Sequence, residues 1–271
     1  MMLKTEMRNP KTTHIDKMDT LAMLKVINEE NMNSVLAVER ELENIAVAVD
    51  KATECLKRGG RIIYIGAGTS GRIGVMDASE CPPTYGVSYD TVIGIIAGGE
   101  KCLTRAGEGG EDVAEAGVDD LKARNVCEKD FVVGISVAGG AKYVLSAVRY
   151  AKRVGAVTVG LTSNSESELA KITDIVICPD TGAEVITGST RMKGGNAQKF
   201  VLNMISTGAM VKCGYVYENL MVNLKPTNVK LKNRMISIVS EIVGCDAGHA
   251  RKLLENNDWD IKKAVKNSDN L

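Results

Sequence analysis

A glycine-rich turn at residues 66–71 carries the residue types that bind a phosphate group. It reads Gly66-Ala67-Gly68-Thr69-Ser70-Gly71, follows the β-branched and aromatic run 62–65, and precedes a helical pattern. Glycine lets the backbone take positive φ and approach a ligand closely, and the unpaired N–H groups at the start of a helix favour an anion. Thr69 and Ser70 add hydroxyl donors without adding charge. The sequence therefore predicts a phosphate site at Gly68, Thr69 and Ser70.

Two nucleotide-binding motifs match this turn only in part. Its glycines fit G-x-G-x-x-G, but the dinucleotide motif also needs an acidic residue about 20 positions later, at the end of the next strand. That strand, 91–96, runs instead into Ala97-Gly98-Gly99. The Gly-Lys-Ser/Thr of a P-loop is also missing. The remaining alternatives are a phosphate site of another kind and a plain turn between strand and helix.

The residues after the turn narrow the choice of family. Residues 77–86 read Asp-Ala-Ser-Glu-Cys-Pro-Pro-Thr-Tyr-Gly, and the proline pair predicts that the helix ends abruptly near Glu80. The whole stretch 66–87, GAGTSGRIGVMDASECPPTYGV, closely resembles the signature of the bacterial N-acetylmuramic acid 6-phosphate etherases, which belong to the sugar-isomerase (SIS) family. The resemblance runs from Thr5-Glu6-Met7-Arg8-Asn9-Pro10 to the C-terminal helices.

The resemblance implies an acid/base pair, Glu80 and Glu111. Taken alone, the acidic cluster 108–112 would equally suit the first turn of a helix, where carboxylates complement the dipole. The implied substrate carries a D-lactyl ether at C3, and in the open-chain sugar the C2 proton is acidic. By resemblance Glu111 removes that proton and Glu80 protonates the departing lactate, after which water adds to C3. The reversed assignment stays open, and no metal or organic cofactor is required.

Two further loops are predicted to hold the sugar. The first begins at Ser136, but where etherases usually read Ser-Gly-Arg-Thr-Pro-Tyr this chain has Ala-Gly-Gly-Ala-Lys-Tyr at 138–143. Two hydroxyls and a guanidinium are thereby lost, so either backbone N–H groups and Lys142 replace them, or the substrate differs, or activity is reduced.

The second loop, 182–193, contains Gly-Ser-Thr-Arg-Met-Lys, which resembles a family segment. Ser189 and Thr190 are natural N-caps of the helix that follows, and with Thr187 they also offer donors to an anion. Glu184 is placed as a third carboxyl near the sugar.

The order of elements predicts an α/β fold. Strand patterns at 62–65, 91–96, 131–136, 157–161 and 175–177 alternate with helical patterns at 72–80, 111–124, 141–153, 166–171 and 191–213. This predicts the SIS-type three-layer αβα sandwich with a five-stranded parallel sheet, whose ligands gather at the carboxyl ends of the strands.

Helical additions are expected at both ends of the chain. Helices at 20–29 and 35–58 precede the sheet, and helices at 228–243, 247–255 and 259–267 follow it. The last three resemble the small ubiquitin-associated-type fold, with Trp259 as a core residue. We therefore expect a helical lead-in (1–58), a SIS domain (59–222) and a C-terminal module (223–271).

Composition excludes several other classes of function. The 271 residues have zero net charge and only 4% aromatic residues, which argues against nucleic-acid or membrane-surface binding. Seven isolated cysteines and two histidines do not form a zinc motif. The polar N-terminus predicts no secretory signal, so we expect a cytosolic protein with reduced thiols.

The predicted function is thus a lyase that acts on a phosphosugar, and by resemblance it forms a homodimer in which one site borrows residues from the neighbour. The main alternative is a non-catalytic regulator that binds a sugar phosphate and controls a partner protein. An aldose–ketose isomerase is a third possibility, but it gives no reason for the segment 77–84.

Overall fold

The fold is built around a parallel sheet of five strands. The computed structural model describes residues 4–107 and 109–268. The strands are β1 (Ile62–Gly66), β2 (Val92–Ile96), β3 (Phe131–Ile135), β4 (Val157–Leu161) and β5 (Ile175–Ile177), in the spatial order β2-β1-β3-β4-β5. All pairs are parallel, with Ile62 aligned to Val92 on one side and to Phe131 on the other. The central strands β1 and β3 are buried throughout because both faces of the sheet are covered.

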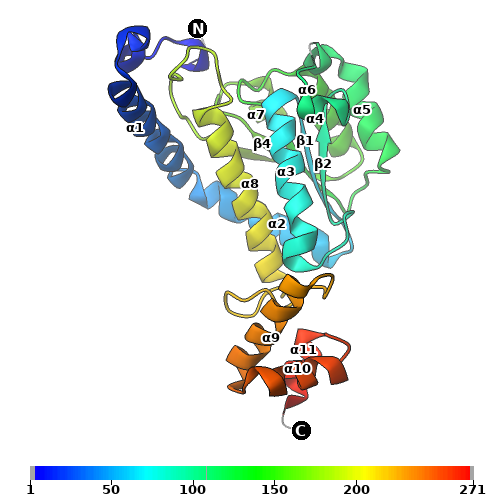
Figure 1. Ribbon diagram of the computed structural model, residues 1–271. Coiled ribbons are helices and arrows are strands. Elements are labelled where there is room, and N and C mark those ends of the chain that lie inside the picture. Colours follow the sequence, from blue (N-terminus) through cyan, green and yellow to red (C-terminus); the bar gives the residue numbers. More distant parts are fainter. Residues whose placement is uncertain (1–3, 108, 269–271) are drawn as a thin grey trace.

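Helices cover the two faces of the sheet (Figure 1). On one face α2 (Leu42–Lys57), α3 (Gly68–Tyr85) and α8 (Lys193–Lys212) pack against a core that contains Tyr64 and Phe131. The other face packs on α5 (Ala114–Ala123), α6 (Lys142–Arg153) and α7 (Glu168–Ile172), with Ile63 and Val132 in its core. The short helix α4 (Lys101–Thr104) and the 3₁₀ turn η4 (Gly110–Asp112) lie between β2 and α5. The predicted three-layer α/β fold is confirmed.

Helix α3 runs past the proline pair that was predicted to end it. It continues to Tyr85 and stops at Gly86, which has φ +67°. Pro82 and Pro83 remove two backbone donors in the last turn, but burial of Cys81 and Tyr85 in the core favours the helical path. The Tyr85 hydroxyl also lies 3.0 Å from that of Thr207 on α8. The prediction was wrong because the rule for proline is local, whereas the packing is tertiary.

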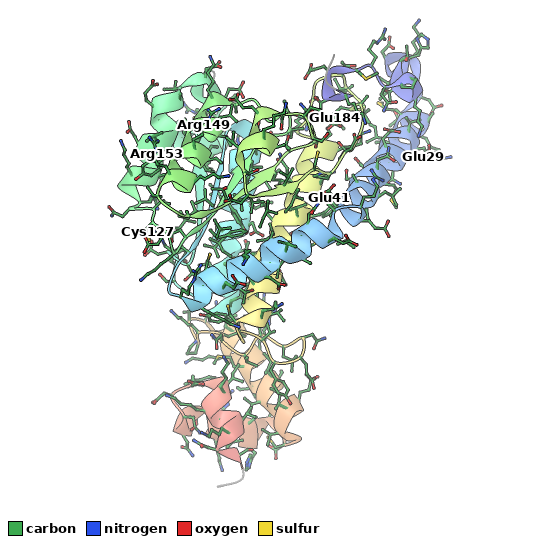
Figure 2. All side chains as sticks on the ribbon, turned by 180° about the vertical axis from the view of Figure 1, so that it is seen from behind. Glu29, Glu41, Cys127, Arg149, Arg153 and Glu184 are labelled. Carbon is green, nitrogen blue, oxygen red and sulfur yellow. The ribbon has the colours of Figure 1, made fainter. Side chains whose placement is uncertain are left out.

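The N-terminal helices are divided at a different point from the predicted one. Helix α1 spans Thr20–Glu39 with Asp19 as N-cap, and α2 begins at Leu42. The break falls where Arg40 donates to the Asp180 carbonyl at 3.1 Å and Glu41 accepts from the Cys178 N–H at 3.1 Å. Figure 2 shows Glu41 at this junction. Contacts with a loop more than a hundred residues away therefore set the boundary.

An N-terminal arm of three 3₁₀ turns precedes α1. The turns are η1 (Lys4–Glu6), η2 (Pro10–Thr12) and η3 (Ile15–Lys17). Thr5, Asn9 and Thr12 are buried in the arm. The Thr12 hydroxyl donates to the Val185 carbonyl at 2.8 Å, and the Asn9 amide donates to the Ala183 carbonyl at 3.2 Å. The arm is thus tied to the loop that leads into α8.

The C-terminal helices form a separate apolar cluster. Helices α9 (Val229–Val243), α10 (Ala247–Asn256) and α11 (Ile261–Lys266) enclose Met235, Val239 and Leu253. They lie beyond the end of α3, opposite the N-terminal arm (Figure 1). Trp259 packs against this cluster while remaining partly exposed, and the Lys232 ammonium lies 5.0 Å from its ring centroid. A contact with the apolar core agrees with the expected packing role of Trp259.

Candidate active site

The candidate active site is a cavity of about 320 Å³ at the carboxyl ends of β1 and β3. The strand order reverses between these two strands, and ligands of doubly wound sheets bind at such a switch point. Six predicted site residues line the cavity: Gly68, Thr69, Ser70, Glu111, Ser136 and Thr190. Three others do not line it: Glu80, Glu184 and Ser189.

The glycine turn begins the helix earlier than the sequence pattern indicated. Helix α3 starts at Gly68, so Thr69 and Ser70 belong to its first turn, where backbone N–H groups lack intrahelical partners. Gly68 has φ +53°, which side-chain-bearing residues rarely adopt. A Cβ on Gly71 would stand 2.6 Å from the Gly66 carbonyl oxygen. Glycine at these two positions therefore allows the strand and the helix to meet closely beneath the cavity.

Glu111 reaches the cavity from a 3₁₀ turn rather than from an α-helix. The turn η4 precedes α5, which begins only at Ala114, and Glu108 of the same acidic cluster lies outside the described residues. Glu111 is exposed, and it lines both the main cavity and a second cavity beside it. A carboxylate at this wall can accept a proton from a ligand held by the glycine turn.

Glu80 lies far from Glu111 within one chain. It is exposed on α3, twelve residues after Gly68, which corresponds to about 18 Å along the helix axis. Helix α3 leads away from the cavity toward the C-terminal helices (Figure 1). The structure therefore does not bring the two predicted acid/base residues together in a single subunit.

Glu184 caps the long helix α8 instead of lining the cavity. Its two carboxylate oxygens accept from the backbone N–H groups of Lys193 at 3.1 Å and of Gly194 at 2.9 Å, and the residue is 1% exposed. Figure 2 shows it near the arm and α1. The prediction that Ser189 and Thr190 cap this helix was wrong, because the helix begins at Lys193, two residues later than predicted, and Glu184 accepts from its first turn from nine residues before.

The altered loop after β3 gives the cavity an apolar wall. Ala138 and Ala141 line it, and the Ser136 hydroxyl accepts from the Gly139 N–H at 3.2 Å. Lys142 does not line the cavity. Its ammonium lies 3.6 Å from the Asp112 carboxylate, and both side chains are exposed. A replacement of the missing family side chains by Lys142 is therefore not seen in this arrangement.

Two charged cavity residues were missed by the sequence analysis. Glu6 lines the main cavity from the N-terminal arm, and Arg72 lines the second cavity from the second turn of α3. Both belong to the segments that carry the family resemblance, 5–10 and 66–87. The signal was present, but nothing local to either segment indicates which side chains face the ligand.

A buried ionic cluster holds the arm and the loop before α8 together. The Lys193 ammonium lies 2.5 Å from the Glu30 carboxylate, and these side chains are 1% and 4% exposed. Glu30 also accepts from Asn9 at 2.7 Å and pairs with Lys11 at 3.0 Å. Burial raises the pKa of Glu30, but hydrogen bonds from Lys193, Lys11 and Asn9 outweigh it and lower the pKa to about 2. The cluster thus ties Asn9 and Lys11 of the arm to Glu30 on α1 and to the start of α8.

A buried carboxyl on α3 joins this helix to α8. Asp77 on α3 accepts from the amide of Asn203 at 2.5 Å and from the hydroxyl of Ser206 at 3.2 Å, both on α8. Burial raises the pKa of Asp77, and these hydrogen bonds act against that rise.

Among the described residues no group of three His, Cys, Asp or Glu side chains is arranged to hold a metal ion.

The fold and the position of the cavity define the class of protein. Residues 44–152 match the glucokinase regulatory protein N-terminal SIS domain, and residues 111–208 match the SIS domain. The solved structure of a phosphoheptose isomerase from Francisella tularensis has a TM-score of 0.53 and 20% identity, covering 73% of this chain and 100% of that chain. The protein is therefore a SIS-fold α/β protein.

Curated relatives assign the particular family. The N-acetylmuramic acid 6-phosphate etherase of Clostridium botulinum strain Okra is 54% identical over 263 residues, which is 97% of this chain and 87% of that protein. The etherase of Cronobacter sakazakii is 50% identical over 97% of this chain and 89% of its own length. This chain belongs to the N-acetylmuramic acid 6-phosphate etherase family. The predicted enzyme class is confirmed, and the non-catalytic regulator is not favoured.

Proposed function

We propose that the protein cleaves the D-lactyl ether of N-acetylmuramic acid 6-phosphate and yields N-acetylglucosamine 6-phosphate and D-lactate. The observation that carries the proposal is the position of Glu111, in one cavity with the hydroxyls of Thr69, Ser70 and Ser136. These hydroxyls and the first turn of α3 suit the phosphate of an anionic sugar. Glu111 lines the same cavity and serves as the base for the reacting part of the sugar.

The reaction proceeds by elimination and then addition. With the ring open, a carboxylate removes the proton at C2, the C3–O bond breaks, and the ether oxygen leaves as lactate after it receives a proton. Water then adds to C3 of the unsaturated aldehyde, with the same pair of carboxyls acting in reverse. We assign the base to Glu111 and the proton donor to Glu80. The substrate derives from cell-wall amino sugar, and we place the reaction in the cytoplasm, where the seven free thiols stay reduced.

The function is tested by isotope labelling. Purified protein is incubated with N-acetylmuramic acid 6-phosphate in ¹⁸O-labelled water. We expect unlabelled D-lactate together with labelled N-acetylglucosamine 6-phosphate, because the ether oxygen leaves with lactate and water enters the sugar. Label in lactate would indicate cleavage on the other side of the oxygen, and a complete lack of lactate would contradict the proposed activity.

The assignment of the phosphate is tested at Ser70. Ser70 is largely buried beside the cavity, so replacement by alanine removes one donor with little change in shape. A hydrogen bond to a charged group contributes roughly 1.5–3 kcal/mol, so Ser70→Ala should raise KM about 10- to 100-fold. Ser79→Ala, an exposed position on the same helix, is the control. KM is measured by steady-state kinetics, and an unchanged KM in Ser70→Ala would mean that the phosphate binds elsewhere.

The separation of Glu80 from Glu111 supports a site shared between two subunits. Glu80 stands about 18 Å along α3 from Gly68, which lines the cavity together with Glu111, and this is too far for two carboxyls that act on neighbouring carbons of one sugar. Helix α1 also exposes large apolar side chains that suit a second copy: Leu21, Leu24, Met32, Val35 and Leu36. We therefore propose a homodimer in which Glu80 of one subunit serves the cavity of the other.

Mixed dimers test this arrangement directly. Glu80→Gln and Glu111→Gln should each be inactive, because each lacks one member of the pair in every site. If the pair acts across the interface, a heterodimer of the two variants has one intact site out of two. Half of the dimers in a co-refolded equal mixture are heterodimers, so roughly a quarter of the sites regain activity. Lactate release from the mixture is the measurement. Activity no higher than that of either parent would mean that both residues act within one subunit.

A further inference from the structure

A second cavity of about 340 Å³ adjoins the one that holds the hydroxyls. The two share Ala67, Gly68 and Glu111, so the Glu111 carboxylate stands at the wall between them. The rest of the second lining consists of small residues around Cys102 and one cation, Arg72. Apart from the Glu111 carboxylate at the shared wall, the cavity offers one guanidinium among small residues, which suits a small anionic group.

The Arg72 guanidinium is held in place by backbone carbonyls and keeps donors to spare. Its Nε donates to the Leu103 carbonyl at 3.1 Å, and its Nη2 donates to the Arg105 carbonyl at 3.0 Å. A guanidinium has five N–H donors in a planar fork, so three remain for a ligand. These bonds fix the plane of the fork without neutralising its charge, because both acceptors are uncharged carbonyls. Such a fork is suited to a carboxylate.

The proposed substrate carries two anionic groups that need separate places. Its phosphate fits the first cavity, where Thr69, Ser70 and Ser136 gather. Its other anion is the carboxylate of the lactyl ether on C3, the carbon next to C2. Since C2 must face Glu111, the lactyl group at C3 leaves the sugar beside that residue, where the second cavity opens.

We propose that the second cavity is the subsite for the lactyl carboxylate and that Arg72 recognises it. This inference rests on the proposed function. Arg72 holds the carboxylate while the C3–O bond breaks, and it also keeps that negative charge away from Glu111. The same contact retains D-lactate after cleavage and discriminates against 3-O-alkyl sugars that lack a carboxylate.

The test compares two substrates and two variants. The substrates are N-acetylmuramic acid 6-phosphate and its lactyl amide, which keeps shape but not charge. The wild-type kcat/KM should favour the acid about 10- to 100-fold, because a charge-assisted pair is lost with the amide. Arg72→Gln should abolish that preference by lowering the rate for the acid while changing the rate for the amide little. Lys101→Gln, which removes an exposed charge from the neighbouring helix α4, should keep the preference.

Two results of this comparison would overturn the inference. Equal losses on acid and amide in Arg72→Gln would mean that Arg72 only holds the loop 103–105 or binds the phosphate. A wild-type enzyme without preference for the acid would place the carboxylate elsewhere. If neither substrate releases lactate, the proposed function fails. The subsite is then tested by binding of the acid and of the amide, which is measured by the shift in melting temperature. Tighter binding of the acid that depends on Arg72 would support the subsite, and equal binding would refute it.

Discussion

Replacement of Glu111 by glutamine should abolish both proton exchange at C2 and lactate release. Glutamine keeps the shape of the side chain but cannot accept a proton, and a positioned general base contributes about 10²- to 10⁴-fold to a rate. Because Glu111 lines both cavities, the loss should appear in kcat and leave binding of the sugar largely intact. Exchange is followed by deuterium incorporation at C2 in heavy water, and lactate by a coupled assay.

A neighbouring carboxylate provides the matched control for Glu111. Asp112 lies on the same 3₁₀ turn, is exposed, and pairs with Lys142 at 3.6 Å outside the cavity. Asp112→Asn should therefore retain near wild-type turnover. In Glu80→Gln the C2 proton should still exchange while lactate release is lost. If Glu111→Gln instead kept exchange and Glu80→Gln lost it, the two roles would be reversed.

Removal of the Glu30 carboxylate should produce the largest loss of stability. Replacing Glu30 by alanine leaves the Lys193 ammonium, which is 1% exposed, as an unpaired buried charge. Breaking a buried pair in this way costs about 3–5 kcal/mol, mostly because the remaining ion has lost its compensation. Urea unfolding should therefore show a clear fall in midpoint with a similar slope. The variant should also raise KM, since the cluster orders the arm that carries Glu6.

Two control variants test whether the unpaired buried charge causes the loss of stability in Glu30→Ala. Glu29→Ala removes an adjacent exposed carboxylate on the same helix (Figure 2) and should change the free energy of unfolding little. Glu30→Met combined with Lys193→Met removes both charges and should recover much of the stability lost in Glu30→Ala. A double variant less stable than Glu30→Ala would argue against the buried charge as the cause.

The same cluster predicts how stability depends on pH. The pKa of Glu30 is lowered to about 2 in the folded protein, while its ordinary value is 4.5. A carboxyl whose pKa is lower in the folded state contributes fully above its unfolded pKa and loses that contribution as pH falls toward the folded value. Wild-type stability should thus decline between about pH 5 and pH 2, and Glu30→Gln should show a shallower decline over this range.

The sequence by itself determined the local structure of the glycine-rich turn at 66–71. The run 62–65, the glycines after it and the hydroxyls of Thr69 and Ser70 predicted a strand, a tight turn and a helix start, and the structure has them. The alternation of strand and helix patterns predicted the parallel sheet. These features depend on neighbours within a few residues, so a single sequence is enough to infer them. The long signature 66–87 likewise identified the family.

Only the tertiary structure decided which side chains meet. Packing of Cys81 and Tyr85 carries α3 through its prolines, and Glu184 caps α8 from nine residues away. Glu6 and Arg72 reach the cavities from segments whose local patterns do not indicate it, whereas Glu80 lies at the far end of its helix. Their positions depend on how whole elements pack against one another, and at Tyr85 and Glu184 burial and long-range hydrogen bonds outweigh local preference.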